Sequence, residues 1–168
     1  YTQNGIAADL HVLVVRPRMV EGATRYELVD VAQVVGNQLV ADGAHLSLNL
    51  PGVRESGQYI FVDLEHAPAF ATGSIDFNTA DADEAFVDVE PLNFVAFATT
   101  QAPVYSLASV AGSRRVSAQS LTRGHRGEAL DTIWVAGEVI TANIALLSAG
   151  PEVESLVPMA GAESVGLQ

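Results

Sequence analysis

The residues that could form a metal site are spread widely along the chain of 168 residues. The four histidines, His11, His45, His66 and His125, never occur as the closely spaced pairs that are typical of zinc sites. We interpret His11 and His45 as outward positions on strands, and His66 and His125 as loop residues. The chain has no cysteine, which excludes disulfides, thiolate metal sites and cysteine nucleophiles. We therefore predict no histidine or cysteine metal site.

Serine hydrolase chemistry has candidate residues but no motif. The sequence has no GxSxG, and the nearest match, 112–114 (Gly-Ser-Arg), lacks the closing glycine. Ser113, His125 and Asp131 supply the residue types of a triad, and His125 with Glu128 or Asp131 could act as an acid–base pair. The glycine patterns of nucleotide-binding loops are also absent. We predict no catalytic residue and no cofactor, and keep a β-barrel hydrolase as a third hypothesis.

Carboxylates cluster between residues 76 and 90. Several oxygens converging from a turn could hold calcium or sodium, but the glycine and the final glutamate of an EF-hand loop are missing. We therefore prefer a solvated acidic loop between two strands. Asp81, as an N-cap three residues before Glu84, predicts one helical turn over 81–86. The carboxylates are Asp76, Asp81, Asp83, Glu84, Asp88 and Glu90.

Although the chain is strongly acidic, half of its cations are clustered in one segment of 13 residues. The net charge is −12, and all eight cations are arginines. This charge disfavours nucleic-acid binding and suits a salty milieu, as in halophilic proteins. Guanidinium groups pair well with carboxylates, so we expect the cluster to contact the acidic loop of a neighbouring copy, with intramolecular salt bridges or a plain exposed loop as alternatives. The cluster is Arg114, Arg115, Arg123 and Arg126.

The elements that must position these residues are strands. Leucines alternate with polar residues over 45–50, and apolar residues alternate again over 59–65, as in half-buried strands. About eight to ten short strands predict an all-β fold, either a single jelly-roll barrel or a β-sandwich. We expect one domain over 1–150 and a C-terminal arm over 151–168, with Trp134 in the core. Further strands are predicted at 10–15, 25–35, 85–89, 93–98, 104–110, 132–136 and 139–147.

Residues 46–61 resemble the corner between strands E and F of immunoglobulin-like sandwiches. Tyr59 follows an acidic-Ser-Gly turn there, although Phe61 stands where the second cysteine would be. This resemblance implies an immunoglobulin-like binding or fibre module of an extracellular or cell-surface adhesin, with its two termini at opposite poles.

A second resemblance is carried by composition. The chain is acidic, free of lysine and cysteine, and rich in predicted strands, which resembles the small single β-barrel (vertical jelly-roll) major capsid proteins of icosahedral haloarchaeal viruses and related Thermus phages. The resemblance implies a virion protein that stands upright over an internal membrane, with copies of itself and a second capsid protein as partners. A structural assembly subunit of this kind, which is not an enzyme and takes no small-molecule substrate, is our first hypothesis.

Overall fold

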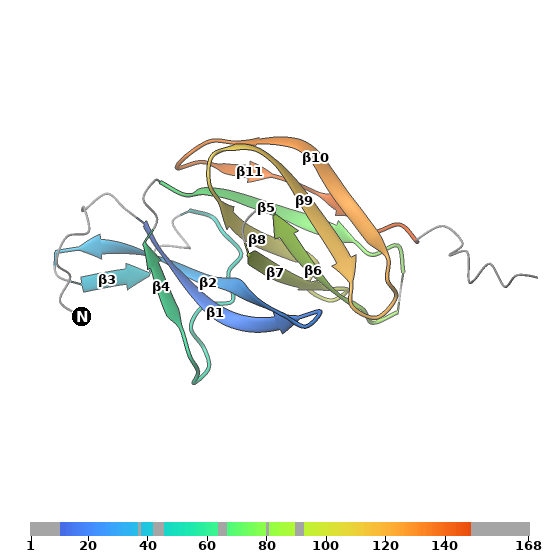
Figure 1. The fold of residues 1–168 in the computed structure, drawn as a ribbon, viewed down its shortest axis with the longest axis horizontal. Helices are drawn as coiled ribbons and strands as arrows, with labels where there is room; N and C mark the ends of the chain where they lie inside the picture. Colours follow the sequence, from blue (N-terminus) through green and yellow to red (C-terminus); the bar gives the residue numbers. More distant parts are fainter. Residues whose placement is uncertain are drawn as a thin grey trace, which may run out of the picture.

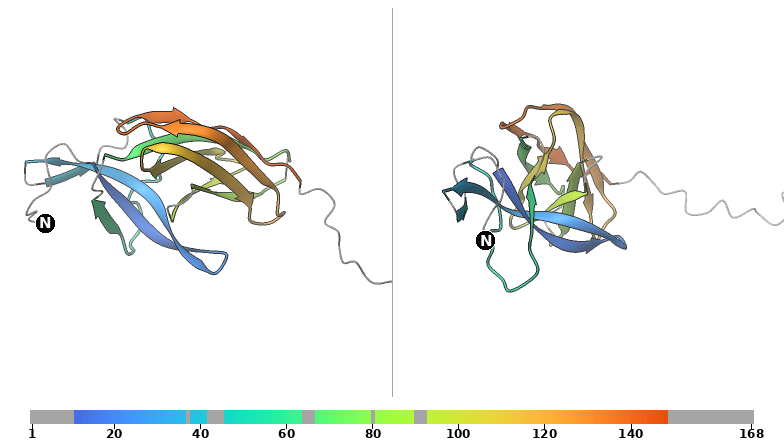
Figure 2. Two further views of the ribbon diagram at one scale, coloured as in Figure 1. Left: turned by 45° about the horizontal axis from the view of Figure 1, so that its top comes forward. Right: turned by 60° about the vertical axis from the view of Figure 1, so that its left-hand side comes forward.

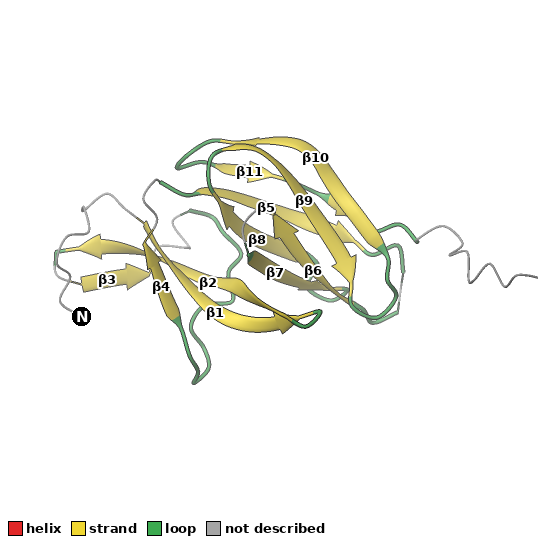
Figure 3. Cartoon of the chain, viewed as in Figure 1, coloured by secondary structure: helices red, strands yellow, loops and turns green. Residues whose placement is uncertain are grey.

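The computed structural model describes residues 11–36, 38–41, 46–63, 67–79, 81–89 and 93–148. Every regular element in these residues is a strand, and two sheets pack as a sandwich (Figures 1 and 3). The predicted all-β class is therefore confirmed, with twelve strands in place of eight to ten. The described residues include no helix that could span a membrane. The strands are β1 (His11–Val20), β2 (Ala23–Val35), β3 (Gln38–Ala41), β4 (Ile60–Asp63), β5 (Ala69–Asp76), β6 (Glu84–Val89), β7 (Phe94–Thr99), β8 (Val104–Ser109), β9 (Gly112–Ser120), β10 (Arg126–Trp134), β11 (Val139–Thr141) and β12 (Ile144–Ala145).

The larger sheet has eight strands in the order β10-β9-β6-β7-β2-β1-β4, and β3 pairs with β2 beside this path. Neighbouring strands are antiparallel except β2 and β7, which pair in parallel. Residues at alternate positions of β1 face opposite sides: Leu13 and Val15 enter the main core, whereas Val12 and Val14 join a second, smaller cluster. The β2–β3 hairpin projects beyond the smaller sheet (Figures 1 and 2).

The smaller sheet is built around β5. This strand pairs antiparallel with β8 and parallel with β11 and β12. β11 and β12 keep the same register with β5, so they are two parts of one strand that is interrupted at Ala142 and Asn143. At the interruption, Ser74 donates its backbone N–H to Asn143 Oδ1 at 3.0 Å. The side chain of Asn143 therefore bridges the gap in the ladder.

Two glycines allow this last strand to lie close against its neighbours. A Cβ at Gly73 would lie 1.8 Å from the carbonyl oxygen of Ala142, and a Cβ at Gly127 would lie 2.2 Å from that of Ala145. Neither glycine has a positive φ, so the need for glycine is steric. Residue 147 then forms an isolated bridge with Arg126 of β10, which links the smaller sheet to one edge of the larger one.

The space between the sheets holds the main hydrophobic core. Trp134, predicted as a core residue, is 1% exposed, and Tyr105, Phe70, Leu13 and Leu107 are buried with it. Burial of aromatic and aliphatic side chains on the inward faces of both sheets is the main favourable term in the folding of such a sandwich.

Three strands, β3, β5 and β9, were not predicted from the sequence. β5 contains a glycine and small side chains, and the exposed face of β9 carries serine and arginine, so neither has the β-branched and aromatic enrichment that identifies a strand. Pairing on both sides stabilises each of them instead: β5 lies between β8 and β11, and β9 lies between β6 and β10. The strand predicted at 132–136 is the end of the longer β10, and the one predicted at 139–147 divides into β11 and β12.

Two other local predictions are wrong. Residues 46–50 form no strand. Each hydrogen bond that joins Asn49 to β8 involves a side chain and so does not form a strand ladder: the N–H of Asn49 donates to Ser106 Oγ at 2.9 Å, and its Nδ2 donates to the carbonyl oxygen of Val104 at 3.2 Å. The helical turn over 81–86 does not form either. Asp83 accepts the N–H of Glu84, at 2.8 Å, and Glu84 begins β6. The predicted arm over 151–168 lies outside the described residues.

Candidate functional site

The four clustered arginines lie on the β9–β10 hairpin but point to different partners. The guanidinium of Arg114 donates to the carbonyl oxygens of residues 111 and 113, both at 3.1 Å. Arg115 is exposed, and its Nε lies 3.7 Å from Glu128 Oε2 on the neighbouring strand. Arg126 lines a polar pocket of about 190 Å³ together with Arg25, Asp88 and Glu128. The hairpin therefore presents no single cationic patch.

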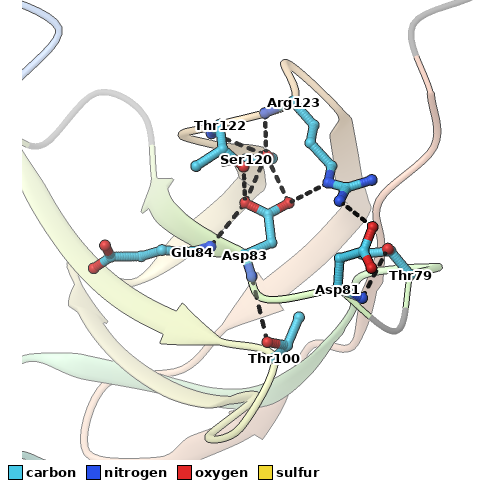
Figure 4. A network of polar contacts seen from close by, with 8 residues as sticks. All are labelled: Thr79, Asp81, Asp83, Glu84, Thr100, Ser120, Thr122 and Arg123. Carbon is cyan, nitrogen blue, oxygen red and sulfur yellow. Dashed lines mark hydrogen bonds and ion pairs between the residues drawn. The ribbon is translucent and has the colours of Figure 1, made fainter.

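Arg123 belongs to a polar network centred on Asp83 (Figure 4). Its Nη2 lies 2.6 Å from Asp81 Oδ2, and its Nε lies 4.0 Å from Asp83 Oδ2. The side chain of Asp83 has no exposed surface. The hydroxyls of Ser120 and Thr122 donate to its carboxylate, at 2.8 and 2.5 Å for the shortest contacts. The network joins the start of β6 to the turn between β9 and β10.

The environment of Asp83 keeps its carboxylate charged. Burial raises the pKa, but the hydrogen bonds from Thr122 and Ser120, the N–H of Glu84 and the charge of Arg123 together outweigh burial and lower it below the usual value of 3.8. A buried carboxylate with all these donors holds the start of β6 against the end of β9 and the turn that follows it. Its oxygens are already engaged within the chain.

Two other carboxylates of the expected acidic loop, Asp76 at the end of β5 and Asp88 in β6, also have partners within the chain. Asp76 Oδ1 accepts the N–H of Asn78 at 3.0 Å, and Asp88 accepts the hydroxyl of Ser117 across the β6–β9 pair. In the described part of the chain, no three histidine, aspartate or glutamate side chains gather as a metal site would require.

Two of the candidate hydrolase residues, Ser113 and His125, lie at opposite ends of the same hairpin. Ser113 pairs with Ile133 at its open end, whereas the carbonyl oxygen of His125 accepts the N–H of Ser120 in the turn at its closed end. His125 is a loop residue, as predicted. The structure does not describe His45 and His66, nor the side chains of His11 and Asp131. The geometry thus does not bring Ser113 and His125 together.

An apolar groove lies on the outer face of the larger sheet, away from the main core. It has a volume of about 450 Å³. Phe61 on β4 is 48% exposed there, and Val53 in the preceding loop is 55% exposed. Asp30 and Gln38 are its polar lining residues. We call this hollow the outer groove. Its apolar lining residues are Val14, Ala32, Leu39, Ala41, Val53 and Phe61.

A local sequence signal for part of this groove exists, although our sequence analysis did not use it. Gly36 and Asn37 separate two valine-rich and leucine-rich runs, and a Gly-Asn pair between apolar runs is typical of a two-residue β-hairpin. Gly36 has a φ of +62°, as such a turn requires. The contribution of Val53 has no comparable signal, because its position depends on a bond from the N–H of Gly52 to the carbonyl oxygen of Val29.

Comparison with known proteins finds no relative: no protein-family model, no curated protein and no solved structure matches this chain.

Proposed function

We propose that this chain is a structural assembly subunit that works through contacts with copies of itself, in a shell of the viral capsid type. The observation that carries the proposal is the outer groove, where Phe61 and Val53 leave about half of their surface exposed. Exposed apolar side chains that gather in one place are a feature of interaction sites. The proposed partners are other copies and, from the capsid resemblance, a second capsid protein.

The charge distribution supports a contact at this groove. The chain carries 20 carboxylates against eight arginines, so two copies repel one another over most of their surface. Among the described residues that line the outer groove, Asp30 is the only charged one. Desolvating the groove against another copy therefore costs little in unpaired charge.

The sandwich also has the stiffness that a shell component needs. Its two sheets share one continuous core, and the bridge between Arg126 and Leu147 ties the end of the smaller sheet to β10. A subunit of this kind keeps its contact surface in one shape, so that symmetry can repeat the same contact many times.

Sedimentation velocity and negative-stain electron microscopy over a concentration series test the proposal. We expect the mass to grow with concentration beyond 17.6 kDa, and more strongly at high salt, because screening weakens the repulsion between acidic subunits. Val53→Asp should reduce association. Ile133→Asp, at a residue that is 71% exposed on β10, is the matched control and should not. A single species of monomer mass at every concentration and salt level would refute the assembly function.

A second candidate is the immunoglobulin-like fibre module. Tyr59 donates its hydroxyl to the carbonyl oxygen of Glu55 at 2.9 Å, the contact that defines a tyrosine corner in such sandwiches. In Figure 1, β1 begins in the left half of the view and the red end of the described chain lies at the right, so the two ends are apart, which suits domains joined in tandem. A monomer that remains folded and shows no association would favour this candidate over a shell protein.

A further inference from the structure

Strand β3 lies at an edge of the larger sheet as far as the described residues show. In the part of the chain that the structure describes, β3 pairs with β2 alone. The β2–β3 hairpin extends past the second sheet in each view (Figures 1 and 2). A free strand edge carries a row of unpaired N–H and carbonyl groups that can accept another strand.

This edge is short, but it lacks three of the features by which proteins usually prevent strand addition. Edge strands are commonly protected by charged residues, proline or a bulge, but residues 31–41 contain no charged residue and no proline, and the β2–β3 register is continuous. In a chain of net charge −12, an uncharged projection is where a second copy can approach with the least repulsion. Neutrality therefore favours another copy of the chain as the occupant.

Both faces of the hairpin carry exposed apolar side chains. On one face, Val35 is 55% and Val40 is 45% exposed. On the opposite face, Leu39 and Ala41 line the outer groove. A two-stranded hairpin is marginally stable in water unless more strands or a packed face support it, so further strands would stabilise this one.

We propose that β3 pairs antiparallel with β3 of a second copy about a twofold axis, which joins the two larger sheets into one. This proposal rests on the assembly function above and names its contact. The same strand of each copy meets its counterpart, so the interface is self-complementary. The added strand also brings the exposed valines of one copy next to those of the other, and it brings the outer groove of each copy next to that of its partner.

The hairpin geometry identifies the peptide groups that would form the contact. Val35 and Gln38 flank a two-residue turn, so they form a hydrogen-bonded pair, and the pairs alternate from there. Val40, opposite Gln33, then directs its N–H toward β2, whereas Leu39 and Ala41 direct theirs toward the open edge. Pairing between copies should therefore protect Leu39 and Ala41 and leave Val40 unchanged.

Residue-resolved amide hydrogen exchange of the full chain tests this directly. We expect the N–H groups of Leu39 and Ala41 to exchange rapidly in dilute protein and to become protected as association proceeds, while Val40 is protected throughout. If Leu39 and Ala41 stay rapidly exchanging in the associated protein, the edge is not the contact. If they are protected in the monomer, another segment of the same chain covers the edge, and the proposal is equally refuted.

Two variants test the contact by association. Ala41→Pro removes one outward donor without touching the inward bond of Val40, and Ala41→Val is its matched control with the donor intact. Because twofold symmetry removes the donor twice, and a net hydrogen bond contributes about a factor of five, we expect about a 25-fold loss of association constant. Val40→Asp should weaken association too, because it adds a negative charge at the contact between two acidic copies. Val135→Asp is its control, since Val135 has the same 45% exposed fraction outside the hairpin.

The outcomes separate this contact from the proposed function. An assembling wild type whose Ala41→Pro and Val40→Asp variants assemble equally well would refute the β3 contact and leave the assembly function in place. A wild type that stays monomeric would refute both. Circular dichroism of each variant establishes that the sandwich is folded before its association is compared.

Discussion

Gly73→Ala should destabilise the fold strongly although it adds a single methyl group. The new Cβ would lie 1.8 Å from the carbonyl oxygen and 2.6 Å from the carbonyl carbon of Ala142. Ordinary contact begins near 3.4 Å, so β5 and the segment joining β11 to β12 must separate by about 1.5 Å. The obstructing atoms are backbone, which leaves no flexible side chain to move aside.

The expected cost follows from the contacts that this separation breaks. The hydroxyl of Tyr105 donates to the carbonyl oxygen of Ala142 at 2.5 Å, and the N–H of Ala142 donates to Thr72 at 2.9 Å. Each contributes about 1 kcal/mol net, and overpacking a tight site adds about 2 kcal/mol. We therefore expect the free energy of unfolding to fall by about 4 kcal/mol.

Urea denaturation, followed by the fluorescence of the single tryptophan, measures this loss. Trp134 is buried, so its emission reports the opening of the core. Gly57→Ala is the matched control: Gly57 has no positive φ, and its nearest neighbour is a Tyr59 ring carbon at 4.0 Å. The control should change stability by no more than about 0.5 kcal/mol.

A double-mutant cycle isolates the mechanism. Tyr105→Phe alone should cost about 2 kcal/mol, because it leaves the buried carbonyl group of Ala142 without its hydroxyl donor. In the Gly73→Ala background it should cost less than half of that, since the bond is already broken. A Gly73→Ala variant as stable as the Gly57→Ala control, or strictly additive effects, would refute the steric argument.

Two further predictions concern buried carboxylates. Asp83→Asn should cost about 2 kcal/mol at neutral pH, since hydrogen bonds to a charged group are stronger than those to an amide. The pKa of Asp83 is lowered in the folded state, so its carboxylate stabilises the fold fully above the unfolded value of 3.8 and loses this effect as the pH falls through the folded value. Urea titrations between about pH 6 and 2 should therefore show the stabilities of the wild type and the Asp83→Asn variant converging at the acidic end. A difference in stability that stays constant with pH would contradict the assignment. Arg16→Met should cost about 3 kcal/mol in the same assay, because Arg16 Nε lies 2.5 Å from Glu27, whose side chain is only 8% exposed. The double variant Arg16→Met/Glu27→Leu should recover most of this loss, and no recovery would show that the pair acts through something other than its buried charge.

The clustered arginines show which features of the candidate site the local sequence could predict. The arginines at 114, 115, 123 and 126 lie within 13 residues of sequence, but alternation along β9 and the turn before β10 direct them differently. Arg123 finds Asp81 and Asp83, 40 or more residues away, through pairing of β9 with β6. The sequence separation between these partners is the reason that no local pattern predicted the network.

The sequence by itself determined the fold class. Alternating apolar residues, β-branched runs and frequent turn residues favour strands, and these preferences act within a few residues of one another. The strands at 25–35, 85–89, 93–98 and 104–110 were predicted for that reason, and so was the burial of Trp134. The same local signals misassigned residues 46–50, where side-chain contacts with β8 replace a strand ladder.

Only the tertiary structure decided which strands pair and what their edges expose. β5 and β9 are strands because neighbours on both sides hydrogen-bond to them, not because of their own residues. Gly73 and Gly127 matter only because the last strand lies against them. The outer groove and the open edge of β3 likewise arise from residues that are far apart in the chain. Pairing and close approach depend on long-range geometry, whereas strand preference depends on neighbours in the sequence, so the first cannot be inferred from the second.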